Sequence, residues 1–176
     1  MKKTIISIII LLFTATSGSF GQSKFSADRV YFGGNLGASF GSFTFVDISP
    51  LVGYRFTDRF TAGIGATYIY IKSNYYAYET SFYGGRIFSR YFITEGIFAH
   101  AEQEVLRGKF YEPTYDLRLN WHTIGNTYIG GGYQSKVGVN SGVFILLLYN
   151  LNSSFYSKQI NPSDPIVVRI GFNIGL

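Results

Sequence analysis

The sequence predicts an all-β protein, an eight-stranded antiparallel up-and-down transmembrane β-barrel that is preceded by a cleavable signal peptide. Three observations lead to this prediction. Apolar and polar residues alternate with a period of two along most of the chain, the later connections are alternately short and long, and an apolar stretch follows two lysines at the start. The length of 176 residues suits a single domain.

The composition excludes several classes of protein. Hydrophobic residues make up 47%, aromatic residues 19% and charged residues only 14%, with 21 Gly and no Cys. This balance argues against disorder, and the lack of Cys excludes a disulfide scaffold and a thiolate zinc site. The formal net charge of +5 comes without a Lys/Arg run beyond the first residues, so we predict no nucleic-acid partner.

The first residues are predicted to be an export signal. Lys2 and Lys3 precede an apolar run over 5–13, and small polar residues follow it. This order is typical of a secretory signal, and the run is too short to cross the ~30 Å hydrocarbon core as a helix. We therefore expect 1–21 to be a signal peptide and 22–176 to be one barrel domain. An uncleaved anchor helix is the alternative.

The first half of the mature chain contains three predicted strands. Alternation places them at about 30–40, 46–56 and 60–70, with turns at Gly41–Ser42 and Thr57–Arg59. A loop is predicted over 73–80.

The second half contains five predicted strands and two longer loops. The strands span about 81–92, 95–107, 125–135, 142–151 and 166–176. The fourth and fifth meet near Ile93–Thr94, a turn covers 136–141, and longer connections cover 108–124 and 152–164. Short turns after strands two, four and six are typical of a barrel that is inserted into a membrane from one side.

The polar face of these strands indicates which side lies inside. A water-facing surface normally carries many Lys and Glu, whereas this face holds Gly with a few Arg and acidic groups, which suit a narrow interior. Pairing of strands four and five places Arg86 roughly opposite Glu102. Unpaired charges in a confined lumen would be costly, so we predict a lumen polar network of Asp47, Arg55, Arg86, Arg90, His100, Glu102, Glu104 and Arg169. Solvated surface pairs on a soluble sandwich are the alternative.

The opposite face is aliphatic along the strand middles and aromatic toward the strand ends. Tyrosine has an apolar ring and a polar tip, so it settles at a membrane–water boundary. We predict that this face contacts membrane lipids and carries an aromatic girdle of Tyr54, Phe56, Phe60, Tyr68, Tyr70, Tyr91, Tyr149 and Phe172.

Several segments resemble a known family, among them GYRFTDRFTAGIG at 53–65, IGGGYQ at 129–134 and VVRIGFNIGL at 167–176. They are similar to the small eight-stranded outer-membrane β-barrels of Gram-negative bacteria, represented by the transmembrane domain of outer membrane protein A and its stand-alone relatives without a peptidoglycan-binding domain. The resemblance covers about 25–176. It implies location in the cell outer membrane and insertion by the barrel-assembly machinery, although Leu176 departs from the usual terminal aromatic residue.

Sequence motifs that resemble catalytic or metal-binding sites are not expected to be functional here. GASFG at 37–41 matches a hydrolase nucleophile elbow only as a string, because a strand is predicted after it instead of a helix. His100 and Glu102 lack the Cys ligands of a deaminase zinc site. We therefore predict no enzyme and no catalytic, cofactor-binding or metal-binding residues, with an enzymatic barrel as a further alternative.

The combined expectation is a non-enzymatic outer-membrane barrel with a polar, salt-bridged and closed lumen. It would act as a structural, accessory or binding component of the envelope. The predicted contact sites for another envelope protein or a glycan are the loops 73–80, 108–124 and 152–164. A small transport or ligand-binding barrel is one alternative, and a soluble secreted lipocalin-like carrier is another.

Overall fold

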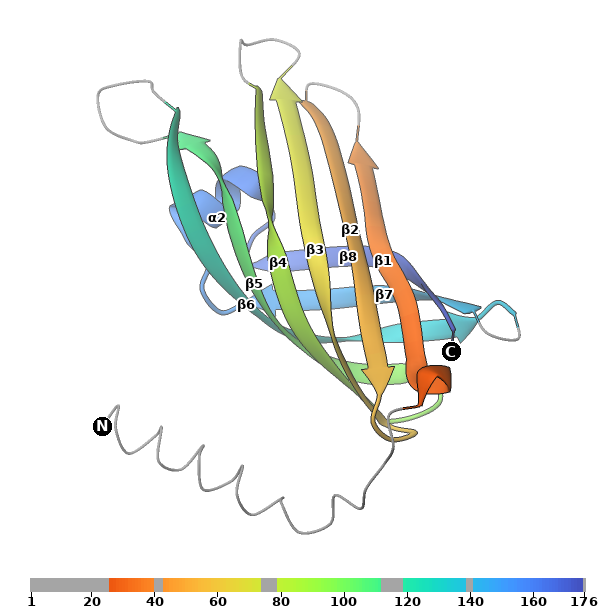
Figure 1. Cartoon of the computed structure of the whole chain (residues 1–176). Helices are drawn as coiled ribbons and strands as arrows, with labels where there is room; N and C mark the ends of the chain where they lie inside the picture. The colour runs from red at the N-terminus through yellow and green to blue at the C-terminus, as the bar shows by residue number, and fades with distance from the viewer. Residues whose placement is uncertain (1–25, 40–42, 74–78, 112–118, 139–140, 176) are drawn as a thin grey trace, which may run out of the picture.

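Eight antiparallel strands follow one another around a closed barrel in chain order, and the last strand pairs with the first. The computed structural model describes residues 26–39, 43–73, 79–111, 119–138 and 141–175. The elements (Figure 1) are η1 (Ala27–Arg29), β1 (Val30–Ser39), β2 (Phe43–Arg55), β3 (Phe60–Ser73), β4 (Glu79–Phe92), β5 (Ile97–Tyr111), β6 (Leu119–Lys136), β7 (Ser141–Asn150), α2 (Phe155–Ile160) and β8 (Ile166–Ile174). The prediction of an all-β, up-and-down antiparallel barrel of eight strands is therefore confirmed.

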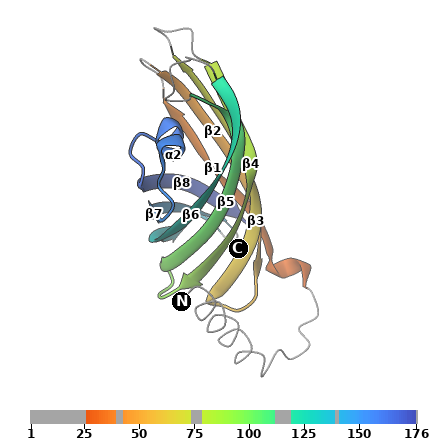
Figure 2. The same cartoon turned by 90° about the vertical axis from the view of Figure 1, so that its left-hand side faces the viewer.

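The two ends of the barrel are built differently. Short turns at 56–59 and 93–96 lie at one end, together with the start of β1 and the end of β8, and we name this the turn end. Each of these turns contains a threonine whose hydroxyl accepts a backbone hydrogen bond, Thr57 from Phe60 at 2.9 Å and Thr94 from Ile97 at 3.0 Å. The opposite end, the loop end, carries the segment with α2, which Figure 2 shows beside the upper part of the barrel.

Several strands are longer than the sequence indicated. The connection predicted over 108–124 is a strand as far as Tyr111 and again from Leu119. Gly108 and Phe110 point inward and Lys109 points outward, so the alternation continues there, but a glycine beside charged residues hid it. β3 extends to Ser73 and β4 begins at Glu79, which shortens the predicted loop over 73–80.

The loop predicted over 152–164 contains the helix α2. Ser154 and Ser157 form a reciprocal cap: the Ser154 hydroxyl accepts from the Ser157 amide at 3.1 Å, and the Ser157 hydroxyl accepts from the Ser154 amide at 2.8 Å. A helix of six residues is too short for helical periodicity to show in the sequence. The predicted signal peptide at 1–21 and the turn at Gly41–Ser42 lie outside the described residues.

Hydrophobic side chains cover the outer surface of the barrel, whereas charged side chains lie inside it. Among the aliphatic residues that face outward, Ile64 and Ile170 are 64% and 63% exposed. Among the inward residues, Arg86 and Glu102 are each only 5% exposed. This distribution is the reverse of the one found in water-soluble domains.

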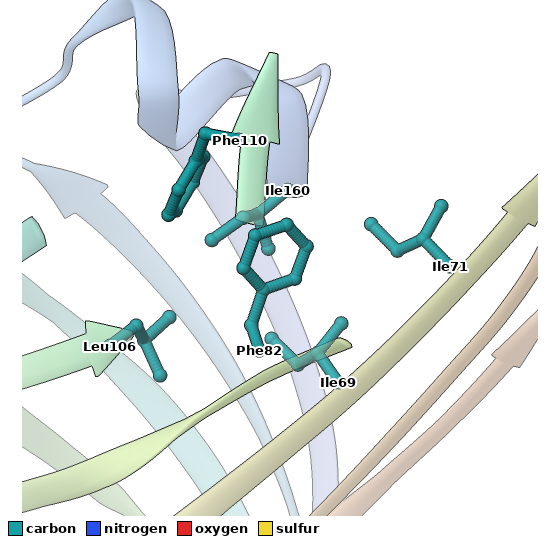
Figure 3. Close-up of a cluster of buried hydrophobic side chains, with 6 residues drawn as sticks. All are labelled: Ile69, Ile71, Phe82, Leu106, Phe110 and Ile160. Carbon is teal, nitrogen blue, oxygen red and sulfur yellow. The ribbon is translucent and has the colours of Figure 1, made fainter. Parts of the chain in front are cut away.

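An apolar cluster fills the interior near the loop end. It comprises Ile69, Ile71, Phe82, Leu106, Phe110 and Ile160 (Figure 3). The rings of Phe82 and Phe110 are 4.7 Å apart at their centroids, and Ile160 reaches the cluster from α2. The short helix therefore covers the interior at this end with an apolar side chain.

A second apolar cluster lies on the inner faces of β5, β6 and β7 and contains Phe98, Tyr128, Phe144, Leu146 and Leu148. Glycines directly across the ladder on neighbouring strands make room for large rings. A Cβ at Gly53 would overlap the Tyr31 ring, and a Cβ at Gly171 would overlap the Phe144 ring. These glycines therefore let aromatic side chains pack flat against the wall of a narrow barrel.

The junction between β1 and β8 is paired along only part of its length. The ladder joins Phe32–Asn35 to 171–174 and ends there. Beyond it, Leu36–Ser39 and 166–170 continue as strands without a partner across the junction. In Figure 1, β8 passes behind β1 in a clearly different direction. We name this open stretch the seam, and a cavity of about 690 Å³ is lined by residues of both its edges.

Candidate functional site

Glu102 is the centre of a group of buried charges inside the barrel. Its Oε1 accepts a hydrogen bond from Nη1 of Arg169 at 2.6 Å, and its Oε2 lies 3.8 Å from Nη1 of Arg86 and 3.3 Å from Nε2 of His100. Strand alternation turns Glu102 inward from β5, Arg86 from β4 and Arg169 from β8. One carboxylate is therefore shared by two guanidinium groups that come from different parts of the wall.

Glu104 extends the group along the same face of β5. Its Oε1 lies 3.8 Å from Nη2 of Arg169 and accepts a hydrogen bond from the Thr67 hydroxyl at 3.1 Å. The Arg169 guanidinium also lies 4.9 Å from the centre of the Tyr128 ring. Arginine suits this place because its planar fork can contact two carboxylates at once.

Arg86 connects these carboxylates to the opposite wall. Its Nη2 donates to the Asn35 side-chain carbonyl at 2.6 Å and to the backbone carbonyl of Ser49 at 3.1 Å. The Asn35 amide then donates to Asp47 Oδ2 at 3.0 Å, and the Ser49 hydroxyl donates to Asp47 Oδ1. The polar contacts therefore cross the whole interior, from β4 and β5 to β1 and β2.

His100 links Arg90 to Glu102. Nε of Arg90 donates to Nδ1 of His100 at 3.3 Å, and the other ring nitrogen of His100 lies 3.3 Å from Glu102 Oε2. A ring that accepts at Nδ1 is neutral and carries its proton at Nε2, from which it donates to Glu102. The Arg90 guanidinium is surrounded by the rings of Phe88, Phe98 and Phe144, whose centroids lie 4.4–5.2 Å away.

The structure joins seven of the eight residues of the predicted lumen network. We name this set the charged belt: Asp47, Arg86, Arg90, His100, Glu102, Glu104 and Arg169. Arg55 lies apart from the belt and lines a separate cavity at the turn end. The apolar clusters near the loop end and along β5, β6 and β7 show that polar groups occupy only part of the interior.

The predicted pairing of Arg86 with Glu102 differs from the observed register. Arg86 lies opposite Glu104 in the ladder, and Glu102 lies opposite Phe88. The four-residue turn at 93–96 shifts the ladder by two residues. Arg86 still reaches Glu102, but it does so diagonally across the sheet.

Seven of the eight residues of the predicted aromatic girdle lie on the outward face of their strands, and Phe56 lies exposed in the turn at 56–59. Six are 38–52% exposed, and Tyr54 and Tyr70 are half-buried. The sequence interpretation missed four outward aromatic residues of the strands that are also exposed, namely Phe32, Tyr83, Trp121 and Tyr133. Tyr83 and Tyr133 could have been found because they follow the outward alternation of their strands, whereas Trp121 fell in a predicted loop.

Other interior polar residues were also missed, notably Asn35, Thr67 and Tyr128, although each has the inward alternation of its strand. Within the described ranges, no group of three or more His, Cys, Asp or Glu residues is arranged to hold a metal ion. No helix in the same ranges is long and apolar enough to cross a membrane.

Substitution of Glu102 and Arg169, singly and together, tests whether the residues of the belt stabilise the barrel jointly. We expect Glu102→Gln or Arg169→Met alone to lower the free energy of unfolding by about 3–5 kcal/mol, because each leaves a buried charge without its partner. The double variant should lose less than the sum of the two, by roughly 1–3 kcal/mol. Urea unfolding followed by circular dichroism measures these changes.

The matched control is Gln103→Ala, on the same strand but on its exposed outer face, for which we expect a change within about 1 kcal/mol. If the losses of unfolding free energy in the two single variants simply add up in the double variant, Glu102 and Arg169 do not belong to one ion cluster.

Comparison with known proteins adds a likeness of fold. No protein-family model and no curated protein matches the sequence. Among solved structures, the chain is similar to the N-terminal β-barrel domain of OprF from Pseudomonas aeruginosa, with a TM-score of 0.49 and 11% sequence identity over 83% of this chain and 96% of that chain. Membership in the outer membrane protein A-like family stays a prediction, and the surroundings of the barrel must be inferred from its own residues.

Proposed function

We propose that the protein is a non-enzymatic β-barrel of the Gram-negative cell outer membrane, with a closed, salt-bridged lumen and a structural or accessory role in the envelope. The observation that carries this proposal is the reversed polarity of the barrel wall. Aliphatic and aromatic side chains cover its outside, and six charged side chains meet inside it.

The outer surface is unsuited to water. Contiguous apolar patches on soluble monomers rarely exceed a few hundred Å², whereas here every strand exposes large hydrophobic residues. Hydrocarbon solvates such a surface, and a closed ladder satisfies most of the backbone groups within it. A soluble lipocalin-like carrier needs the opposite distribution, with its apolar residues inside.

The spacing of the outward aromatic residues fits a bilayer. On β4, Tyr83 and Tyr91 bracket Ile87 and are eight positions apart. At ~3.3 Å per residue this separation is about 26 Å along the strand, and a tilt of about 40° reduces it to about 20 Å of height, close to the ~25 Å apolar band of such barrels. At the loop-end edge of the band, Arg107 and Lys109 each lie 5.7 Å from the Trp121 ring, as expected for an interface with lipid headgroups.

The interior supports a closed lumen. The charged belt crosses from wall to wall, and the loop-end cluster with Ile160 covers it. Ions would have to separate buried charge pairs in order to pass, which is costly. Contact with an envelope protein or a glycan would occur at the loop end, where Leu151 and the first residue of α2, Phe155, are 53% and 50% exposed.

Labels on the outer wall test the membrane assignment. We expect spin labels at Ile64→Cys and Ile170→Cys to collide with dissolved oxygen and to be shielded from a water-soluble nickel chelate, because both sites would face hydrocarbon. A label at Glu95→Cys, in an exposed turn, is the matched control and should collide with the chelate. Equal chelate access at all three sites in vesicles would refute the proposal.

Conductance tests the closed lumen. The protein in a planar bilayer should show no large steady openings, since belt and cluster block the path. Arg169→Ala removes a guanidinium from the belt and should produce more frequent brief openings. Large steady openings of the unchanged protein would contradict a closed lumen even if the membrane assignment holds.

A second candidate function is a small ligand-binding barrel, which the seam cavity favours. Its walls include aliphatic side chains from both edges and from the interior, and its floor includes Glu104, Tyr128 and Arg169. Among the described residues the ladder between β1 and β8 ends at Asn35 and Gly171, so beyond it the two edges lack the strand pairing that hydrocarbon demands. An acyl chain that enters from the bilayer through the seam would match the apolar walls.

Filling the seam cavity tests this second function. A Cβ at Gly37 would meet its neighbours at ordinary contact distances of 3.5–3.6 Å, so Gly37→Leu should fold and occupy the cavity. We expect it to weaken the binding of doxyl-labelled stearic acid by about tenfold, because several methylenes of the acyl chain can no longer be buried in the cavity. Gly85→Leu, on the exposed outer face, is the control and should bind like the unchanged protein. Equal binding by both variants would exclude the seam cavity as the site.

A further inference from the structure

We propose that the turn end of the barrel holds an oxyanion-binding site built around Arg90. A cavity of about 680 Å³ opens at this end, and Arg90 forms part of its inner wall. It is separate from the seam cavity, and the inference does not depend on the membrane assignment.

Arg90 is a buried cation that no acid neutralises. It is 2% exposed, and the structure gives it one hydrogen bond, from Nε to His100. No carboxylate among the described residues lies within 4.0 Å of its nitrogens. Guanidinium stays charged in proteins. The described residues supply no hydrogen bond to the Nη groups, so these groups are donors available to a ligand. The three surrounding rings offset the burial of the charge in part, but they accept no conventional hydrogen bond.

The rest of the cavity is also positive and polar. Among the described residues that line it, Arg55, Arg59 and Lys136 join Arg90, against two acidic side chains, Asp58 and Glu95. A recess lined mainly by one sign of charge concentrates the field and attracts counterions. An anion is therefore the expected occupant.

Asn173 supplies a second, independent sign of a missing partner. Its amide nitrogen donates to Gln134 at 3.0 Å, whereas its buried Oδ1 has no hydrogen-bond partner. Asn173 and Gln134 both line the cavity. Since buried polar atoms are rarely left unpaired, such an atom often marks a place that water or a ligand occupies. A half-turn of this carboxamide would also present its NH₂ group to an anion.

The geometry of Arg90 narrows the ligand to an oxyanion. A guanidinium fork donates two parallel hydrogen bonds to the oxygens of a carboxylate or phosphate group. The cavity is larger than either group alone, so the group can belong to a larger molecule. Carboxylate and phosphate share this chemistry, and binding experiments can separate them.

Calorimetric titration of the folded, detergent-solubilised full chain with inorganic phosphate and with succinate tests the site. We expect saturable binding of at least one of them at low ionic strength. Preference for phosphate would identify a phosphorylated ligand, and preference for succinate a carboxylate ligand. Arg90→Met keeps the side-chain bulk without the charge and should weaken binding about tenfold or more, as expected when charged hydrogen bonds are lost.

The matched control is Arg29→Gln, which removes a positive charge at the same end from an exposed residue that does not line the cavity. It should bind within about twofold of the unchanged chain, because exposed charges are screened. Arg55→Gln, at the cavity wall, should weaken binding measurably and provides the readout if Arg90→Met does not fold. Absence of saturable binding to both anions, or equal affinity of the cavity variants and the control, would overturn the proposal.

Discussion

The shared contact of Glu102 with two arginines is the constraint on which the interior depends. Glu102 comes from β5, whereas Arg86 and Arg169 come from β4 and from β8 across the lumen. Separating the partners of a buried ion pair is costly, so these strands must stay close enough for side chains to meet. A barrel of eight strands satisfies this condition, because its interior is about as wide as two facing side chains. The glycines opposite Tyr31 and Phe144 then follow as the positions where rings need space.

The apolar side chains around the belt explain why it can be both charged and closed. The loop-end cluster, with Ile160 from α2, covers one side. The cluster around Phe144 lines the wall at the level of the belt, where Tyr128 is the ladder partner of Glu102 and Leu146 that of Arg169. Such surroundings lower the local dielectric, so the contacts within the belt are stronger than on a surface, and an unpaired group is also more costly. Among the described residues, Arg86 Nε and Asn173 Oδ1 are the side-chain atoms that are fully enclosed and have no hydrogen-bond partner.

Alternation predicted most of the fold because it records which wall of the barrel each residue faces. It worked best over 60–70, where aliphatic and aromatic residues alternate with glycine and threonine. It failed near Gly108, where a small residue between charges conceals the strand, and at α2, which is too short to show a period. The belt residues were identifiable because they are polar and occupy inward positions of the alternation. Their contacts, however, depend on the register after the turn at 93–96, which alternation does not determine. The seam was equally hidden, since β1 and β8 alternate along their whole length and only their divergence leaves it open.

The distribution of the belt's charges explains why one end of the barrel stays positive. The belt contains three arginines and three carboxylates, so it balances in number. The balance is uneven in space, because Asp47 is held by Asn35 and Ser49 on the side of β1 and β2, and both glutamates contact Arg169. Arg90, nearest the turn end, is left with a neutral histidine and three rings. A group that compensates Arg90 must therefore come from outside the belt, and the adjoining cavity is the side from which it can enter.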